Sequence, residues 1–133
     1  MSPYQSAGTA YQAQAVETAS PAQLVIMLYD GAIGAIARAE HAMAGNERDK
    51  IEVINRELTR AQDIVTELML SLDHDRGGAI AGNLAAIYEF CLAMLTQANL
   101  EKSPHGLPDV KAQLVSLRDA FASAAAQVAA GAA

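Results

Sequence analysis

Apolar residues recur every three or four positions along most of the chain, which is the repeat of an amphipathic α-helix. The clearest case lies between residues 47 and 72, where seven apolar residues follow one another at spacings of 3, 4, 3, 4, 3 and 4. This row consists of Ile51, Ile54, Leu58, Ala61, Val65, Leu68 and Leu72. The pattern predicts a helix over about 47–72 with that row facing a core.

Capping and turn signals place a helix before this one. Ser20 is followed by Pro21 and, at the third position, by Gln23, which is the pattern of a capping box. Gly45-Asn46 is a stop signal. These signals predict a helix over about 21–44.

Two more helices are predicted after residue 72. The break over 74–78 precedes a helix that ends near residue 100. A turn over 102–106, which contains Pro104, precedes a helix with Pro108 in its first turn. The predicted core row of the first is Ile80, Leu84, Ile87, Cys91, Met94 and Ala98. The row of the second is Leu107, Val110, Leu114, Leu117, Phe121, Ala124 and Val128.

Four helices with short connections predict an all-α fold, an antiparallel up-and-down four-helix bundle. Residues 1–18 are mostly Ser, Gln, Ala, Gly and Thr without a sustained period, so they predict a mobile N-terminal arm or short helix before a bundle domain over 19–133. Tyr4 and Tyr11 are seven apart and would share one face of a helix. The arm is therefore read either as a lid over the bundle or as a frayed terminus.

Several helices have more apolar positions than one core face needs. Over 21–44 the predicted inward row is Leu24, Leu28, Ala35, Ala39 and Ala42, and a second row contains Val25, Tyr29, Ile33 and Ile36, with Met27 beside it. Over 79–100, the residues that flank the core row are Tyr88, Leu92 and Leu95. Two interpretations are open: central helices buried almost all round, or a groove that binds an apolar segment of a partner.

Gly31 and Gly34 lie inside the predicted 21–44 helix, where each costs about 1 kcal/mol relative to Ala. Beside Ala35 they form a small-residue face. We interpret them as helix-packing residues that let another backbone approach closely.

Charge and composition exclude several classes of function. The formal net charge of the 133 residues is -6, which argues against nucleic acid or an anionic membrane as the main partner. The N-terminus is not a secretory signal, and no window reaches about 18 uninterrupted apolar residues. A single cysteine, Cys91, can form no internal disulfide. These observations predict a soluble cytoplasmic protein without membrane insertion; the oligomeric state is not predicted.

No catalytic or metal-binding pattern is evident. His41, His74 and His105 lack metal-ligand spacing, and the Glu-x-x-His motif of di-iron bundles does not occur. We therefore predict no enzyme, no metal and no cofactor. An alternative hypothesis is a phosphotransfer bundle that uses His41, although its neighbours are Glu40, Ala42 and Met43, which hold an anion poorly. A self-associating structural bundle is a third hypothesis.

Several segments of the chain together form a recognisable family pattern. They are Tyr11, Val16–Pro21 and Gln23–Ala32, followed by Ala61–Leu68, Gly77–Leu84, Ile87–Phe90 and Leu95–Asn99. The first block, in the N-terminal part of the chain, resembles the signature of the FliS family of flagellar secretion chaperones. The resemblance covers nearly the whole chain in order, and its first block is the most specific.

The resemblance implies a cytoplasmic, non-catalytic bundle that binds the disordered C-terminal segment of flagellin. Such a chaperone prevents premature polymerisation and helps deliver flagellin to the export gate of the flagellar type III apparatus. The arm would cover the binding groove when it is empty. The candidate flagellin-binding residues are Tyr11, Val16, Leu24, Met27, Leu28, Tyr29, Tyr88, Leu92 and Leu95.

The chain departs from the family pattern in three places. Ala93 and Met94 stand where the family commonly has two arginines, and Phe121 stands where a tryptophan is frequent. The turn over 102–108, with its two prolines, differs from the usual short acidic connection. The first change enlarges the apolar face of the predicted third helix.

Overall fold

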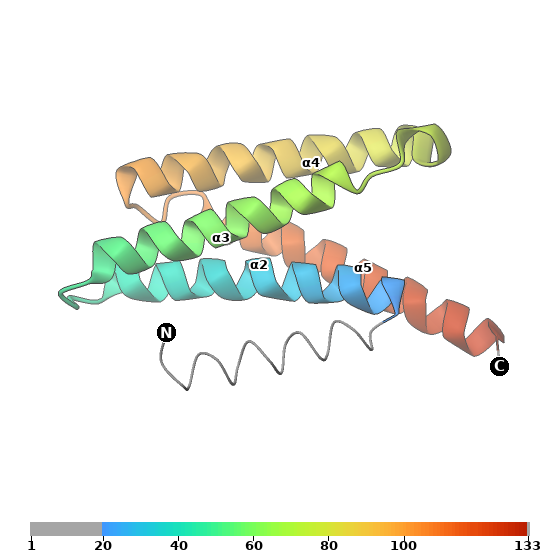
Figure 1. Ribbon diagram of the computed structural model, residues 1–133, viewed down its shortest axis with the longest axis horizontal. Helices are drawn as coiled ribbons and strands as arrows, with labels where there is room; N and C mark the ends of the chain where they lie inside the picture. Colours follow the sequence, from blue (N-terminus) through green and yellow to red (C-terminus); the bar gives the residue numbers. More distant parts are fainter. Residues whose placement is uncertain (1–19, 133) are drawn as a thin grey trace.

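The computed structural model describes residues 20–132, which form four helices. They are α2 (Pro21–Ala44), α3 (Lys50–Leu70), α4 (His74–Glu101) and α5 (Leu107–Ala132). Consecutive helices run in opposite directions, so the predicted all-α up-and-down bundle is confirmed (Figure 1). The predicted arm over 1–18 lies outside the described residues.

The helices do not pack evenly around one axis. α2 packs against both α3 and α5, and α3 also packs against α4, whereas α4 and α5 contact one another much less. Figure 1 shows α5 crossing beneath α4 and extending past the start of α2. The side chains of 123–131 on α5 are almost all exposed as a result.

The capping box that opens α2 is present. The Gln23 backbone N–H donates to Ser20 Oγ at 3.2 Å, and the Ser20 N–H donates to Gln23 Oε1 at 2.9 Å. α3 begins at Lys50, later than the predicted residue 47, because residues 45–49 form the connection to α2. Boundaries of this kind depend on local turn geometry, which periodicity does not report.

α4 begins earlier than predicted, at His74. Asp73 caps a first turn by accepting the Arg76 N–H at 3.0 Å, and the helix then kinks at Gly78. Gly78 has φ 51° and ψ -123°, a conformation that side-chain-bearing residues rarely adopt. The predicted break is therefore a kink between one capped turn and the main part of α4.

The predicted core row of the second helix is confirmed along its middle. Ile54, Leu58, Ala61, Val65 and Leu68 are buried, and the ends of the row are more open: Ile51 is exposed and Leu72 half-buried. A core of this kind is the main source of stability for a small bundle.

The predicted inward row of α2 is only partly correct. Ala35 and Ala39 are buried as predicted, but Leu24 and Leu28 are half-exposed, and the core instead receives Tyr29 and Ile36. Because α2 has two apolar rows with the same period, the spacing alone does not say which row faces the core.

The predicted core row of α4 is likewise only partly correct. Cys91 and Ala98 are buried as predicted, but Ile80 is 71% exposed. Tyr88 and Leu95, which were predicted to flank the row, are buried. The kink at Gly78 separates the first turn from the rest of the helix. The main part of α4 is thus oriented toward the core independently of the first turn.

A pair of tyrosines joins α2 to α4 inside the core. The Tyr29 and Tyr88 hydroxyls form a short hydrogen bond, and the Phe121 ring of α5 lies against Tyr29 with 5.6 Å between ring centroids. Burial raises the pKa of both hydroxyls, and the bond to Tyr88 raises that of Tyr29 further. Both groups therefore stay protonated, and each satisfies the other.

Ion pairs tie α2 to its neighbours on the surface. Arg118 Nε lies 2.9 Å from Asp30 Oδ1, and Lys111 Nζ lies 2.5 Å from Glu40 Oε1, so both pairs join α2 to α5. Such solvent-exposed pairs contribute little to stability, because water and salt screen them. They orient α5 more than they stabilise it.

Two of the described helices, α2 and α4, are long and apolar enough to cross a membrane by length and composition alone. The core helices of soluble proteins meet the same criteria. Both helices contribute to the bundle core, so this is weak evidence for a membrane segment.

The tyrosine pair predicts a non-additive mutation series. Tyr29→Phe leaves the Tyr88 hydroxyl buried without its partner, so we expect a loss of about 1–3 kcal/mol in the free energy of unfolding. The double change Tyr29→Phe with Tyr88→Phe removes both hydroxyls and should lose less than the sum of the single losses. Urea unfolding of the three variants measures this, and additive losses would show that the hydroxyls do not act as a pair.

Burial of Cys91 predicts that its thiol reacts slowly in the native protein. Burial raises its pKa from 9.0 to about 11, and the thiolate is the reactive form. We expect almost no reaction with a disulfide reagent at pH 8 in the native protein and full reaction in urea. Fast labelling of the native protein would contradict the assigned burial.

The raised pKa of Cys91 also makes the stability depend on pH. The thiol ionises less readily in the folded than in the unfolded chain, so its contribution to the free energy of unfolding is present below pH 9 and is lost as the pH rises toward 11.

Candidate functional site

An open groove lies between α2 and α3, with a volume of about 840 Å³. Its apolar lining comes from Leu24, Met27 and Leu28 of α2 and Ile64 of α3, and all four side chains are half-buried. We call this feature the α2/α3 groove. The charged residues at its edges are Asp30, Arg38, Arg60 and Glu67.

A glycine sets how closely the two walls approach. A Cβ atom added to Gly31 would lie 3.2 Å from Cδ1 of Ile64, so the missing side chain gives the isoleucine its space. Farther along α2, Gly34 is covered by its own helix, because the Arg38 guanidinium lies 3.2 Å from the position of its Cβ. Gly31 thus lies at a helix contact, whereas Gly34 accommodates a folded arginine.

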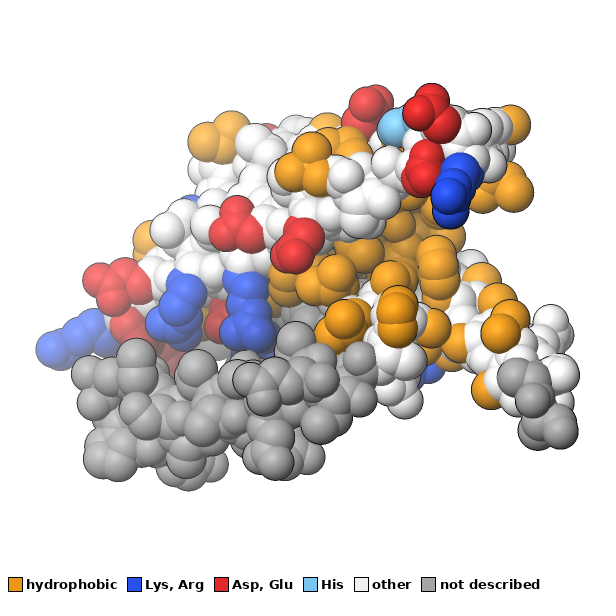
Figure 2. Space-filling view, turned by 45° about the vertical axis from the view of Figure 1, so that its right-hand side comes forward, with side chains coloured by type: hydrophobic (Ala, Val, Ile, Leu, Met, Phe, Trp, Pro, Cys, Tyr) orange, Lys and Arg blue, Asp and Glu red, His pale blue; other side chains and the backbone are white. Residues whose placement is uncertain are grey.

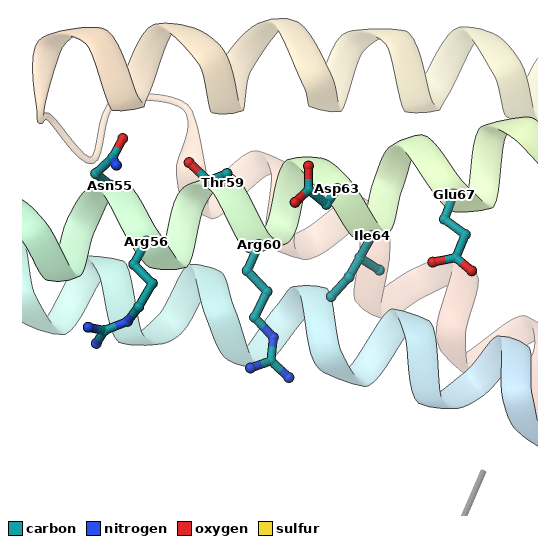
Figure 3. Close-up of a pocket in the computed structure, with 7 residues that line it drawn as sticks. All are labelled: Asn55, Arg56, Thr59, Arg60, Asp63, Ile64 and Glu67. Carbon is teal, nitrogen blue, oxygen red and sulfur yellow. The ribbon is translucent and has the colours of Figure 1, made fainter. Parts of the chain in front are cut away.

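The α3 side of the groove is a mixed face (Figure 3). Arg56, Arg60, Ile64 and Glu67 extend toward the α2 side of α3, at positions close to one turn apart. Figure 3 also shows Asn55, Thr59 and Asp63 on the side toward α4; all seven line a smaller hollow of about 440 Å³.

A buried carboxylate anchors the arginine end of the groove. Glu57 is only 7% exposed, and its carboxylate lies 3.0 Å from Arg38 Nε and 3.6 Å from Arg56 Nε. A buried carboxylate requires such partners, because an unpaired charge in the interior is costly. Each of the two arginines is consequently held at its Nε atom, while its side chain remains more than half exposed.

A second apolar surface lies at the end of α3. An open hollow of about 300 Å³ is lined there by apolar residues of α4 and the preceding turn, chiefly Leu72, Ile80, Ala81 and Leu84; we call it the α4 hollow. Figure 2 shows hydrophobic side chains gathered between the start of α4 and the outer part of α5. Val128 on α5 is 73% exposed. Contiguous exposed apolar surface is a common feature of interaction sites.

The structure brings together three of the predicted binding residues. Leu24, Met27 and Leu28 lie in one wall of the α2/α3 groove. Leu92 is half-buried on α4 and packs against the core. Tyr11 and Val16 lie outside the described residues.

Three other predicted binding residues need correction. Tyr29, Tyr88 and Leu95 are buried in the core and are not accessible to a partner in this structure. The physical reason is that the two tyrosine hydroxyls satisfy one another, so both rings are buried without an unpaired polar atom.

The opposite wall of the groove was not among the predicted site residues. Ile64 lies outside the core row of its helix, with Arg60 four residues before it and Glu67 three residues after it. An apolar residue between charges on the outer face of a helix is the signal that could have identified this wall. The set of charged residues around the groove could be recognised only from the fold, because Arg38 comes from α2 and the others nearby, Arg60 and Glu67, come from α3.

The residues from 20 to 132 contain no group of three or more His, Cys, Asp and Glu side chains placed to hold a metal ion. His41 is exposed in the last turn of α2, and His74 and His105 are exposed at the start of α4 and in the turn before α5.

Comparison with known proteins agrees with the geometry of a binding bundle. The family model for the flagellar protein FliS matches residues 4–128. A flagellar secretion chaperone FliS of Bacillus subtilis is 34% identical over 116 residues, which is 87% of this chain and 84% of the relative. The FliS chaperone of Salmonella typhimurium is 34% identical over 80% of this chain and 78% of its own length.

A third relative, the FliS chaperone of Escherichia coli, is 34% identical over 89% of each chain. All three are named as secretion chaperones, a non-enzymatic class, which leaves the phosphotransfer hypothesis for His41 without support. With a family model that spans residues 4–128 and relatives that match along most of their length, this chain belongs to the FliS family of flagellar secretion chaperones.

Proposed function

We propose that this chaperone binds the C-terminal segment of flagellin in the α2/α3 groove, in the cytoplasm. Bound in this way, flagellin is kept from polymerising prematurely and is presented to the flagellar export gate. The observation that carries the proposal is the open apolar groove lined by Leu24, Met27, Leu28 and Ile64 in a chain of this family.

The groove has the dimensions of a helix-binding site. Leu24 and Arg38 mark its two ends on α2, and fourteen residues at 1.5 Å each span about 21 Å. A bound helix of about four turns fits this length, with its apolar side against the four groove residues. A disordered segment loses conformational entropy when it orders there, which keeps the affinity moderate and the complex releasable.

The N-terminal arm acts as a competitor for the same groove. Residues 1–18 connect through Ser20 to α2, whose first turns form one wall, so the arm is tethered at the groove's end. Tyr11 and Val16 supply apolar side chains that suit an apolar groove. A tethered segment needs only weak affinity to compete, because its effective concentration is high.

A groove variant tests flagellin binding. Met27 lines the groove without belonging to the core cluster, so Met27→Asp should place a charge in the interface and leave the bundle folded. We expect the Kd for a peptide of the flagellin C-terminal segment to rise about 30-fold, which corresponds to about 2 kcal/mol. Isothermal titration calorimetry measures the Kd, and a negative heat-capacity change should accompany binding.

The matched control is Leu100→Asp, at a side chain that is 81% exposed near the far end of α4. It adds the same charge away from the groove and should leave the Kd unchanged. Circular dichroism verifies that both variants are folded. Equal weakening by the two variants would remove the groove from the proposal, and no binding by the folded wild type, with a tight oligomer in sedimentation, would favour a self-associating structural bundle.

Removal of the arm tests the competition. A chain that begins at residue 19 should bind the peptide about three- to ten-fold more tightly than the full chain, because the competitor is gone. Weaker binding without the arm would show that residues 1–18 contribute contacts to flagellin instead of blocking the groove.

A further inference from the structure

The α2/α3 groove has opposite charges toward its two ends. Arg38 and Arg60 line the groove toward the end of α2 and the start of α3, with Arg56 in the adjoining hollow, and Glu67 and Asp30 lie closer to the other end. Figure 3 shows Arg56, Arg60 and Glu67 extending from α3 along the same side. Arg60 and Glu67 are seven residues apart, or about 10 Å along the helix axis.

The arginine end retains excess positive charge. Arg38 and Arg56 share one buried carboxylate, that of Glu57, and Arg60 lies one turn farther along α3 in the groove lining. Within residues 20–132, no ion pair involves Arg60. This end is therefore suited to receive an anionic group.

The opposite end has the reverse balance. Asp30 is paired with Arg118 of α5 at 2.9 Å, whereas Glu67 has no ion-pair partner among the described residues. The Glu67 carboxylate thus remains to attract a positive group at the apolar part of the groove.

A helix in the groove experiences these charges through its own dipole. Its N-terminal end is equivalent to about half a positive charge and its C-terminal end to about half a negative charge. The last four carbonyl groups also lack partners within the helix. If the chain itself ends there, a full carboxylate charge is added to the negative end.

Building on the proposed binding of flagellin, we infer that the bound segment is a helix that runs parallel to α2 and places its terminal carboxylate against Arg60, Arg56 and Arg38. The planar guanidinium group has several donors in a fixed geometry, which suits both a carboxylate and the unpaired carbonyls of a last helical turn. In this orientation the helix N-terminus lies beside Glu67, so both ends of the dipole are favourably placed.

The rest of the partner then has an apolar exit path. The chain before the bound helix leaves the groove at the end of α3, where Leu70 is 78% exposed. The α4 hollow begins two residues farther, at Leu72. In the reverse orientation the upstream chain would instead leave across the arginines and the charged connection over 45–50.

Two synthetic peptides test the orientation. Each contains the last 20 or so residues of the flagellin made by the same organism, one with a free C-terminal carboxylate and one amidated, so that they differ by a single charge. We expect the amidated peptide to bind the full-length protein about three- to ten-fold more weakly in calorimetry at low salt, with a smaller difference at high salt.

Protein variants locate the effect. Arg60→Gln should weaken the free-carboxylate peptide and reduce the difference between the two peptides to less than two-fold. The control is Arg48→Gln, which removes the same charge from an exposed residue in the connection between α2 and α3. It should leave the difference between the peptides at its wild-type size.

A spin label reads the direction independently of affinity. With the label at the peptide N-terminus, the amide signals of Leu24 and Glu67 should broaden more than those of Arg56 and Arg60 in NMR spectra of the complex. With the label at the C-terminus the order should reverse. The opposite pattern, or equal affinity of the two peptides for the wild type, would overturn the inferred orientation while flagellin binding itself stands; failure of both peptides to bind would overturn the proposed function as well.

Discussion

The arrangement of the bundle rests on the packing of α3 against α2. Gly31 leaves room for the Cδ1 atom of Ile64, and a few turns away the buried Glu57 carboxylate reaches back to Arg38 across the same pair of helices. These two contacts join the helices along their length. The core lies on one side of the pair and the groove on the other.

A bundle of four helices needs one apolar face from each, and α2 has two. One of them, with Tyr29 and Ile36, completes the core, so the other, with Leu24 and Leu28, remains half-exposed beside α3. In the proposed function, stability and binding are therefore served by different residues of one helix. The charged residues around the groove lie on the same two helices, α2 and α3, and under the inferred orientation they set the direction of the bound segment.

The sequence was sufficient for the fold class and for the core of α3, because that helix has a single apolar row. It was insufficient for α2 and α4, whose several rows share one period, so Tyr29, Tyr88 and Leu95 were assigned to a surface although they are buried. The kink at Gly78 depends on a positive φ angle, which the spacing of apolar residues does not predict. Likewise, the groove charges combine Arg38 with Arg60 from a different helix, and only the register brings them together.

The overhanging part of α5 has an energetic consequence. Beyond Phe121 most side chains are alanine and face solvent, so helical order there is maintained by the intrinsic preference of alanine with little help from tertiary packing. The bundle and this extension are thus separate cooperative units. The last turns can melt and re-form while the folded core stays intact, and hydrogen exchange of their amides proceeds through local opening at a small fraction of the global unfolding free energy.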